Sequence, residues 1–286
     1  MPVEQTGSTF STTTTPPNRE DPVTAADDLR LCFDRVIPDD YNPARAASER
    51  ARVLDHLLRE SDETRTIDAA AVEPPARLAL LPVKKWQNGT VLRCRFLDGS
   101  AVQQKKVQEK AALWEPYANI SIRFVTTPDE HIRISFSADA GSWSAVGTDA
   151  LVEKYFPKYQ PTMNFGWLRD DTDDDEYERV VVHEFGHALG AIHEHQSPAA
   201  SGLRWNRAEV YRVFSGAPNF WSKEEIDFNI LDRYSKEQTN YTELDLHSIM
   251  LYHFPASLFE NGQETPVNMH LSEQDRTFIA TMYPKV

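Results

Sequence analysis

The sequence predicts an α+β fold, and three observations lead to this prediction. Segments in which apolar and polar residues alternate, as they do in strands, recur between residues 90 and 165. A stretch with a helical start signal separates the first of these segments from the second, which gives a β-α-β-β order. Hydrophobic residues form 40% of the chain and aromatic residues 10%, enough for a substantial core. This order predicts a mixed sheet with a helix on one face.

Local signals for the sheet region are clear. Asn88-Gly89 lies between KKWQ and TVLRCRF and predicts a tight hairpin between two strands. Ser100, with Gln103 three residues later, predicts the start of a helix that runs to about Trp114. The segments SIRFV, HIRISF and PTMNFGW then alternate as strands do.

The charge balance of the 286-residue chain restricts the classes of function. The chain carries 44 acidic and 30 basic residues, a net charge of −14, whereas a nucleic-acid-binding protein normally presents a basic surface. No apolar run approaches the ~18 residues of a membrane span. We therefore expect a protein without a nucleic-acid partner or a membrane span. We also expect it to be a monomer. Its first residues lack the basic start and apolar stretch of a standard secretory signal, so the localisation stays open.

The composition of the chain changes near residue 81. Residues 1–27 are rich in Ser, Thr and Pro and have no apolar period, so we expect a disordered tail. Residues 28–80 contain apolar residues that predict short helices, followed by a connector, and we interpret them as a pro-like or accessory segment. The two cysteines, Cys32 and Cys94, exclude a disulfide scaffold and leave one bridge or two free thiols open.

The chemistry of the sequence is concentrated in HEFGHALGAIH, which begins at His183. His183 and His187 are four residues apart in a stretch with helical apolar spacing, so their imidazoles lie on one face. Two imidazoles in this arrangement can bind one tetrahedral zinc ion. On a continuous helix, His193 would lie ~9 Å beyond His187, too far to share that ion. We therefore predict that the helix ends at Gly190, which lacks a Cβ and suits a left-handed exit.

Glu184 follows the first histidine and can flank the metal without binding it. Three neutral imidazoles leave Zn²⁺ with its full charge and an open fourth position, where the ion lowers the pKa of a water molecule toward ~7. Glu184 can accept a proton as this water attacks a carbonyl and later pass it to the leaving amine. The reaction class is therefore amide hydrolysis, most naturally of a peptide bond. The competing interpretations are three ordinary core histidines and an exposed helix carboxylate.

Two features beside the motif have simpler interpretations. The acidic run at residues 170–178 precedes the helix, where carboxylates favour the positive helix end, and Ca²⁺ binding is the alternative. We expect His195 to be a surface residue or to support the site from outside the ligand set. The five histidines without ligand spacing are given no role: His56, His131, His247, His253 and His270.

The segment HEFGHALGAIHE resembles the zinc-binding pattern of the astacin-type metalloendopeptidases, a family of the metzincin clan. A second match, SIMLY at residues 248–252, is similar to the Met-turn of that family, although Leu251 replaces the usual histidine. The resemblance implies that Met250 forms an apolar floor beneath the three imidazoles. It also implies that Tyr252 hydrogen-bonds the oxyanion, and such a donor is worth ~3–4 kcal/mol.

A third segment, GSWSAVG, resembles the strand that lines the substrate cleft in the family, with Ser142 in place of the usual cysteine. The resemblance implies that Trp143, Ser144 and Val146 belong to an edge strand with which an extended substrate pairs. It also implies that Glu194, which follows the third histidine, meets the freed amino terminus of the mature enzyme.

These matches imply a two-lobed, zincin/metzincin-like α+β catalytic domain over residues 81–286. Residues 81–190 would form an upper lobe with the twisted sheet, and residues 191–286 a mostly helical and irregular lower lobe, with substrate in the cleft between them. The implied function is a zinc endopeptidase that holds one Zn²⁺ per chain and cleaves protein or peptide substrates. The alternative is a zinc-stabilised protein-binding module with little or no turnover, although structural zinc sites usually have four protein ligands.

Cys32 lies upstream of the predicted catalytic domain and has three possible roles. Its thiolate could occupy the open zinc position and hold the enzyme latent, as in some metzincin pro-segments. No other part of such a switch motif is visible in the sequence. A simple buried thiol and a bridge to Cys94 are the alternatives.

Overall fold

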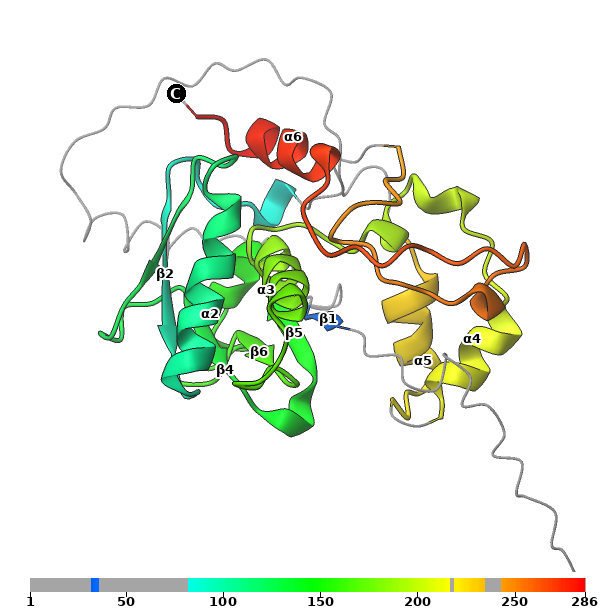
Figure 1. The fold of residues 1–286 in the computed structure, drawn as a ribbon, viewed down its shortest axis with the longest axis horizontal. Coiled ribbons are helices and arrows are strands. Elements are labelled where there is room, and N and C mark those ends of the chain that lie inside the picture. Colours follow the sequence, from blue (N-terminus) through cyan, green and yellow to red (C-terminus); the bar gives the residue numbers. More distant parts are fainter. Residues whose placement is uncertain (1–31, 36–81, 217–218, 235–242, 286) are drawn as a thin grey trace, which may run out of the picture.

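Figure 1 shows the computed structural model, which describes residues 32–35, 82–216, 219–234 and 243–285. The tail predicted over residues 1–27 lies outside the described residues, and of the segment 28–80 the structure describes Cys32–Arg35. Cys32–Arg35 forms a strand, so the helix expected there is wrong. Leu29, Leu31 and Phe33 recur with the period of two that favours a strand.

A mixed sheet of six strands forms the centre of the upper lobe, as the sequence predicts. The strands pair in the order β1-β5-β6-β4-β2-β3, with β5 antiparallel to β6 and the other pairs parallel. Strand β4 is buried at every position, which is expected of a strand covered on both faces. The strands are β1 (Cys32–Arg35), β2 (Val91–Phe96), β3 (Ser121–Phe124), β4 (Ile132–Ser135), β5 (Ser142–Ala145) and β6 (Met163–Phe165).

Helices α2 (Ala101–Ala111) and α3 (Asp174–Ala188) pack side by side against this sheet (Figure 1). Helix α2 begins with the predicted capping box, in which the side chains of Ser100 and Gln103 bond each other's main chain. A 3-10 turn extends it to Trp114, whose Nε1 donates to a main-chain carbonyl of α3 at 3.0 Å. The upper lobe thus presents α3 as a fixed support for the histidine motif.

The hairpin predicted at Asn88-Gly89 is wrong, although a tight turn is present. Gly89 has φ +84, a conformation that favours glycine. The residues before the turn form a 3-10 helix, Pro82–Lys84, instead of a strand. The side chain of Trp86 is buried, and its Nε1 donates to Ala188 O at the end of α3. This contact directs the chain toward α3, and β2 pairs in parallel with β3 and β4 instead.

Short helices and irregular segments make up the described part of the lower lobe. Helix α6 (Glu273–Met282) is capped by Ser272 and then returns the chain to the upper lobe. There the OH of Tyr283 donates to Leu189 O at 2.7 Å. The helices are α4 (Arg207–Phe214), α5 (Lys223–Ile226), the π-helical turn Asp227–Leu231 and α6 (Glu273–Met282). The remaining 3-10 turns are Ala138–Ala140, Gly147–Leu151, Glu194–Gln196, Ala200–Gly202 and Ala256–Leu258.

The thiol of Cys94 is free and buried within β2, so Cys94 takes part in no disulfide bridge in this structure. Burial raises the pKa of the Cys94 thiol, which favours its unreactive protonated form. Among the described residues, none of the helices has the length and apolar character needed to cross a membrane.

Candidate active site

Helix α3 carries the first part of the site. Its first turn contains Asp174, Asp175 and Glu176, and these carboxylates favour the positive end of the helix dipole. From Val180 to Ala188 every residue is buried, and this stretch includes the first two histidines of the motif. Both imidazoles therefore lie on the half of α3 that is packed on all sides.

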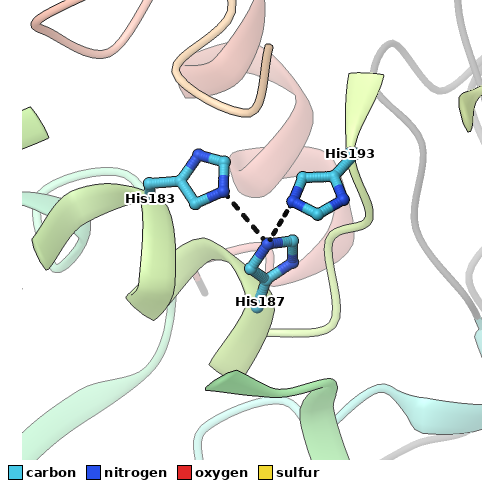
Figure 2. A group of neighbouring side chains, drawn as sticks. All are labelled: His183, His187 and His193. Atoms are coloured by element: carbon cyan, nitrogen blue, oxygen red, sulfur yellow. Dashed lines mark hydrogen bonds between the residues drawn. The ribbon is translucent and has the colours of Figure 1, made fainter. Parts of the chain in front are cut away.

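The helix ends at the glycine that the sequence predicts. Gly190 has φ +100, in the left-handed region. Its N–H donates to His187 O at 2.8 Å, and the N–H of Ala191 donates to Gly186 O at 3.0 Å. This pair of bonds is the Schellman arrangement, which satisfies the last helix carbonyls and turns the chain sharply. The turn brings His193 back beside His187 instead of carrying it along the helix axis (Figure 2).

Three imidazoles converge on one point (Figure 2). Nε2 of His187 lies 3.1 Å from Nε2 of His183 and 3.0 Å from Nε2 of His193. On its outer side, each ring places Nδ1 against an oxygen atom. An oxygen of this kind accepts a hydrogen bond, so Nδ1 carries the proton and Nε2 presents a lone pair to the centre. The oxygens are Ile249 O for His183 (2.8 Å), Ala191 O for His187 (2.9 Å) and Gln196 Oε1 for His193 (3.2 Å).

Three inward lone pairs at this separation suit a metal cation. Burial lowers the pKa of His187 to about 4 and the pKa values of His183 and His193 well below their ordinary value. The imidazoles are therefore neutral at pH 7, the form that binds metals. A tetrahedral ion with bonds of ~2.0–2.1 Å sets its ligand atoms about 3.3 Å apart, close to the separations in this structure. In the described part of the chain, this is the one cluster of potential ligands that could hold a metal.

Met250 lies against the helix turn that bears both α3 ligands. A Cβ added to Gly186 would lie 2.4 Å from Met250 Sδ, so the missing side chain at Gly186 allows the methionine to approach the helix closely. The carbonyl of Met250 accepts a hydrogen bond from Glu194 N at 3.0 Å. This bond ties the segment after the third histidine to the turn that contains Met250.

Tyr252 reaches the same centre from the lower lobe. Its OH lies within hydrogen-bond distance of Nε2 of His193. The ring centroids of these two residues are 4.4 Å apart, and the Tyr252 ring also stacks on His183 at 5.1 Å. The phenol oxygen is therefore beside the point on which the three nitrogens converge.

Two glutamates next to the histidines are completely buried. Glu184 and Glu194 both have 0% exposure, so the interpretation of Glu184 as an exposed helix carboxylate is wrong. Oε1 of Glu194 accepts from Asp245 N at 3.0 Å, whereas Oε2 has no hydrogen-bond partner within the described residues. Burial raises the pKa of Glu194 to about 8.

Comparison with known proteins identifies the family. Residues 80–279 match the model of the peptidase family described as Astacin. The chain belongs to the astacin family. The protein is accordingly a metallopeptidase, with the α+β metzincin-like fold that the sequence predicts. The comparison with curated proteins gives no match.

Solved structures of myroilysin agree with this chain in fold. One is 43% identical, with a TM-score of 0.70, and the match covers 73% of this chain and 99% of that chain. A second myroilysin structure is 37% identical, with a TM-score of 0.56, and covers 78% and 99%. The hatching enzyme HCE-1, a zinc-protease from the medaka fish Oryzias latipes, is 19% identical, with a TM-score of 0.45, and covers 73% and 98%.

Asp275, a residue near the site that sequence reasoning missed, holds the Met-turn of this astacin-family chain in place. Its Oδ1 accepts from Ser248 Oγ at 2.7 Å, and its Oδ2 accepts from Ile249 N at 2.8 Å. The same Oδ2 accepts from Ser272 N at 2.9 Å, which is part of the capping box of α6. Burial raises the pKa of Asp275 to about 6. The signal for this residue is the Ser-x-x-Asp spacing, which predicts a helix start but not a link to the Met-turn.

His195 is buried, so of its two expected roles the surface position is wrong. Its ring stacks on His193 at 5.2 Å, and its Nε2 lies 3.1 Å from Asn229 O. His131 is also buried, and its Nδ1 accepts from Arg93 N at 3.1 Å. Burial lowers the pKa of His131 to about 3, so its imidazole is neutral at pH 7. His131 does not belong to the cluster of three histidines. The remaining histidines lie outside the cluster (His247, His253 and His270) or outside the described residues (His56).

Strand β5 is not an edge strand in this structure, which corrects the expectation for the GSWSAVG segment. It carries Trp143 and Ser144, Val146 follows it, and all three are buried. Strand β1 pairs with β5 in parallel, with Phe33 opposite Trp143 and Asp34 opposite Ser144. In this astacin-family chain, the amino-terminal region therefore supplies the strand at the edge.

Proposed function

We propose that the protein is a zinc-dependent endopeptidase that binds one Zn²⁺ per chain through His183, His187 and His193. The observation that carries this proposal is that three buried, neutral imidazoles direct their Nε2 atoms toward one point. Three protein ligands with one further position are typical of catalytic zinc sites, whereas structural sites use four. A zinc ion held there would supply a Lewis acid that activates water for attack on a peptide carbonyl. Membership of the astacin family supports the choice of metal and substrate.

Glu184 acts in this proposal as the general base. It follows His183 directly on α3, is fully buried and does not belong to the cluster of three histidines that could hold the metal. A carboxylate in this position accepts a proton from the attacking water as the carbon–oxygen bond forms. It then delivers the proton to the amine nitrogen as the carbon–nitrogen bond breaks.

Tyr252 acts as the hydrogen-bond donor to the oxyanion. Its OH already lies beside Nε2 of His193, where the carbonyl oxygen of a bound peptide would gain negative charge. Met250 packs against Gly186 in the turn of α3 that bears His183 and His187. Gly190 allows the bend that returns His193 to the cluster. These two residues shape the site without touching substrate.

Strand β5 is the strand on which an extended peptide substrate pairs, through Trp143, Ser144 and Val146. Strand β1 holds that edge, so residues 28–80 act as a pro-like segment whose strand must leave before substrate binds. Cleavage of the segment would create a new terminal ammonium group. Oε2 of Glu194 is buried and has no partner in the described residues. The new ammonium group could pair with this carboxylate and compensate its buried negative charge.

The test compares Glu184→Gln with Glu178→Gln, a matched change on the same helix at a glutamate that pairs with Lys110. Zinc content and cleavage of an unfolded protein substrate are measured on the full chain before and after limited proteolysis. We expect Glu184→Gln to keep its zinc and lose cleavage on the order of 10²–10⁴-fold, because the base is gone. Glu178→Gln should keep both zinc and cleavage.

The outcomes separate the two functional classes. Chelation should abolish wild-type cleavage, and added Zn²⁺ should restore it. Full activity of Glu184→Gln would refute the assignment of the base. A wild-type chain that binds zinc but cleaves nothing, before or after proteolysis, would favour the protein-binding module instead.

A further inference from the structure

Gln196 lies at the junction between the third histidine and the end of a lower-lobe helix. It is 3% exposed, and its Oε1 lies 3.2 Å from His193 Nδ1. Its Nε2 donates to Phe228 O at 2.6 Å and lies 3.5 Å from Asp232 O. Its main-chain carbonyl accepts from Tyr234 N at 3.0 Å. Both ends of the side-chain amide therefore have partners.

These partners determine which way the amide points. Phe228 O and Asp232 O are carbonyl oxygens that can only accept hydrogen bonds, so the NH₂ group of Gln196 faces them. The amide oxygen then faces His193, and because it can only accept, Nδ1 of His193 carries the proton. This tautomer leaves Nε2 of His193 free of a proton, and Nε2 is the atom that faces His187 at 3.0 Å.

The carbonyls that hold Gln196 are accessible because a helix ends there. Helix α5 continues into the π-helical turn Asp227–Leu231, after which the chain becomes extended. The last carbonyls of a helix have no partner further along it. Gln196 donates to the carbonyl of Phe228, and His195 contacts that of Asn229 at 3.1 Å. Two consecutive side chains after the third histidine therefore fasten the same helix end.

We propose that Gln196 is a positioning residue for the third metal ligand, fixing the tautomer and ring orientation of His193. This inference rests on the proposed metal site. The other two ligands place Nδ1 against the main-chain carbonyls of Ile249 and Ala191. A main-chain carbonyl is present whatever the side chain of its residue, so these two contacts do not depend on residue type. Among the three, His193 is the one whose Nδ1 faces a side-chain oxygen, so its orientation depends on residue type. Outer partners of this kind typically change metal affinity 10–100-fold.

Two variants separate the acceptor role of Gln196 from its donor role. Gln196→Leu removes both the oxygen that faces His193 and the NH₂ group that faces the helix. Gln196→Glu keeps an oxygen for His193 but loses the donor to Phe228, so it should destabilise the metal-free protein and keep the ligand contact. Ser222→Ala is the matched control, because Ser222 caps the opposite end of α5 by accepting from Glu225 N.

The experiment measures the zinc affinity of the full chain by competition with a chromophoric chelator. Thermal unfolding of the metal-free protein is the second readout. We expect Gln196→Leu to weaken zinc binding about 10–100-fold and Gln196→Glu to stay within about threefold of the wild type. Ser222→Ala should lower Tm and leave zinc affinity unchanged. With Co²⁺ in place of zinc, Gln196→Leu should also shift the visible absorption bands.

Several results would overturn this inference. Wild-type zinc affinity in Gln196→Leu would do so, as would equal losses in Gln196→Leu and Gln196→Glu. Equal losses in Gln196→Leu and Ser222→Ala would show a merely structural role. A wild-type chain that binds no zinc would instead overturn the proposed function. Failure of the inference alone leaves wild-type zinc binding and cleavage intact.

Discussion

The two halves of the site are positioned by different means. His183 and His187 come from one regular helix, in which the spacing of four residues sets their relative position. His193 comes from irregular chain beyond the helix, and buried polar groups such as Gln196 and Asp275 hold this region in place. A helix needs only its own period to align two ligands. The other half depends on individual hydrogen bonds between distant residues, so single substitutions there should have large effects.

Among the variants that test this comparison, the largest expected effect is that of Tyr252→Phe, which removes a donor contributed by the part of the site outside α3. We expect kcat to fall on the order of 10²–10³-fold with little change in KM, because the phenol acts on charge that develops in the transition state. Steady-state kinetics with a peptide substrate measure both constants. Tyr177→Phe on α3, whose OH donates to Arg169 O, is the control and should keep its kcat. An unchanged kcat in Tyr252→Phe would remove the oxyanion role.

Asp275→Ala tests whether the Met-turn depends on one buried carboxylate. The change leaves Ser248 Oγ and Ile249 N without their acceptor, so we expect the free energy of unfolding to fall by about 2–4 kcal/mol. Urea denaturation of the metal-free protein gives this value. Asp174→Ala removes an exposed carboxylate from α3, the helix that carries His183 and His187, and should change the free energy of unfolding much less. Similar losses in the two variants would contradict the comparison.

Gly190→Ala tests the bend that joins the two halves. A residue with a Cβ at φ +100 is strained, and we expect a loss of about 1–2 kcal/mol in the free energy of unfolding. Gly202→Ala is the matched control, because an added Cβ there meets no atom within 4 Å. It should leave stability unchanged or slightly higher. Equal stability of Gly190→Ala and the wild type would argue against a bend that requires glycine.

The smallest expected effect concerns pH and His131, a buried histidine of the upper lobe. Its pKa falls from the ordinary 6.5 to about 3 in the folded chain because of burial. Its contribution to stability is therefore fully present above pH 6.5 and is lost as the pH falls from 6.5 toward 3. His131→Asn keeps an acceptor for Arg93 N but does not titrate. Between about pH 7 and about pH 4.5, we expect the Tm of His131→Asn to fall less than the Tm of the wild type. An equal fall in the two proteins would contradict this expectation.

Features that depend on neighbouring residues were predictable from the sequence. The start of α2 at Ser100, the pairing of His183 with His187 and the exit at Gly190 all follow from contacts within about one helical turn. The mixed sheet was also predictable, because the order of strands and helix limits the arrangements that bury both sheet faces.

Features that depend on distant partners were not predictable. The turn at Asn88-Gly89 has the local signal of a hairpin, but Trp86 packs toward the end of α3 and no strand forms in the described residues just before the turn. The neighbour of β5 is β1, which comes from residues 32–35, far earlier in the chain. Gln196 was missed for the same reason. The carbonyl to which its side chain donates belongs to Phe228, which is more than one secondary-structure element further along the chain.

The most direct test of the account is the zinc content of the purified full chain and of its His193→Ala variant, measured by mass spectrometry of the metal after dialysis. We expect one zinc ion per chain in the wild type and almost none in His193→Ala, although His183 and His187 stay in place on α3. Equal zinc content in the two proteins would contradict the claim that the bend at Gly190 brings a third ligand to the metal.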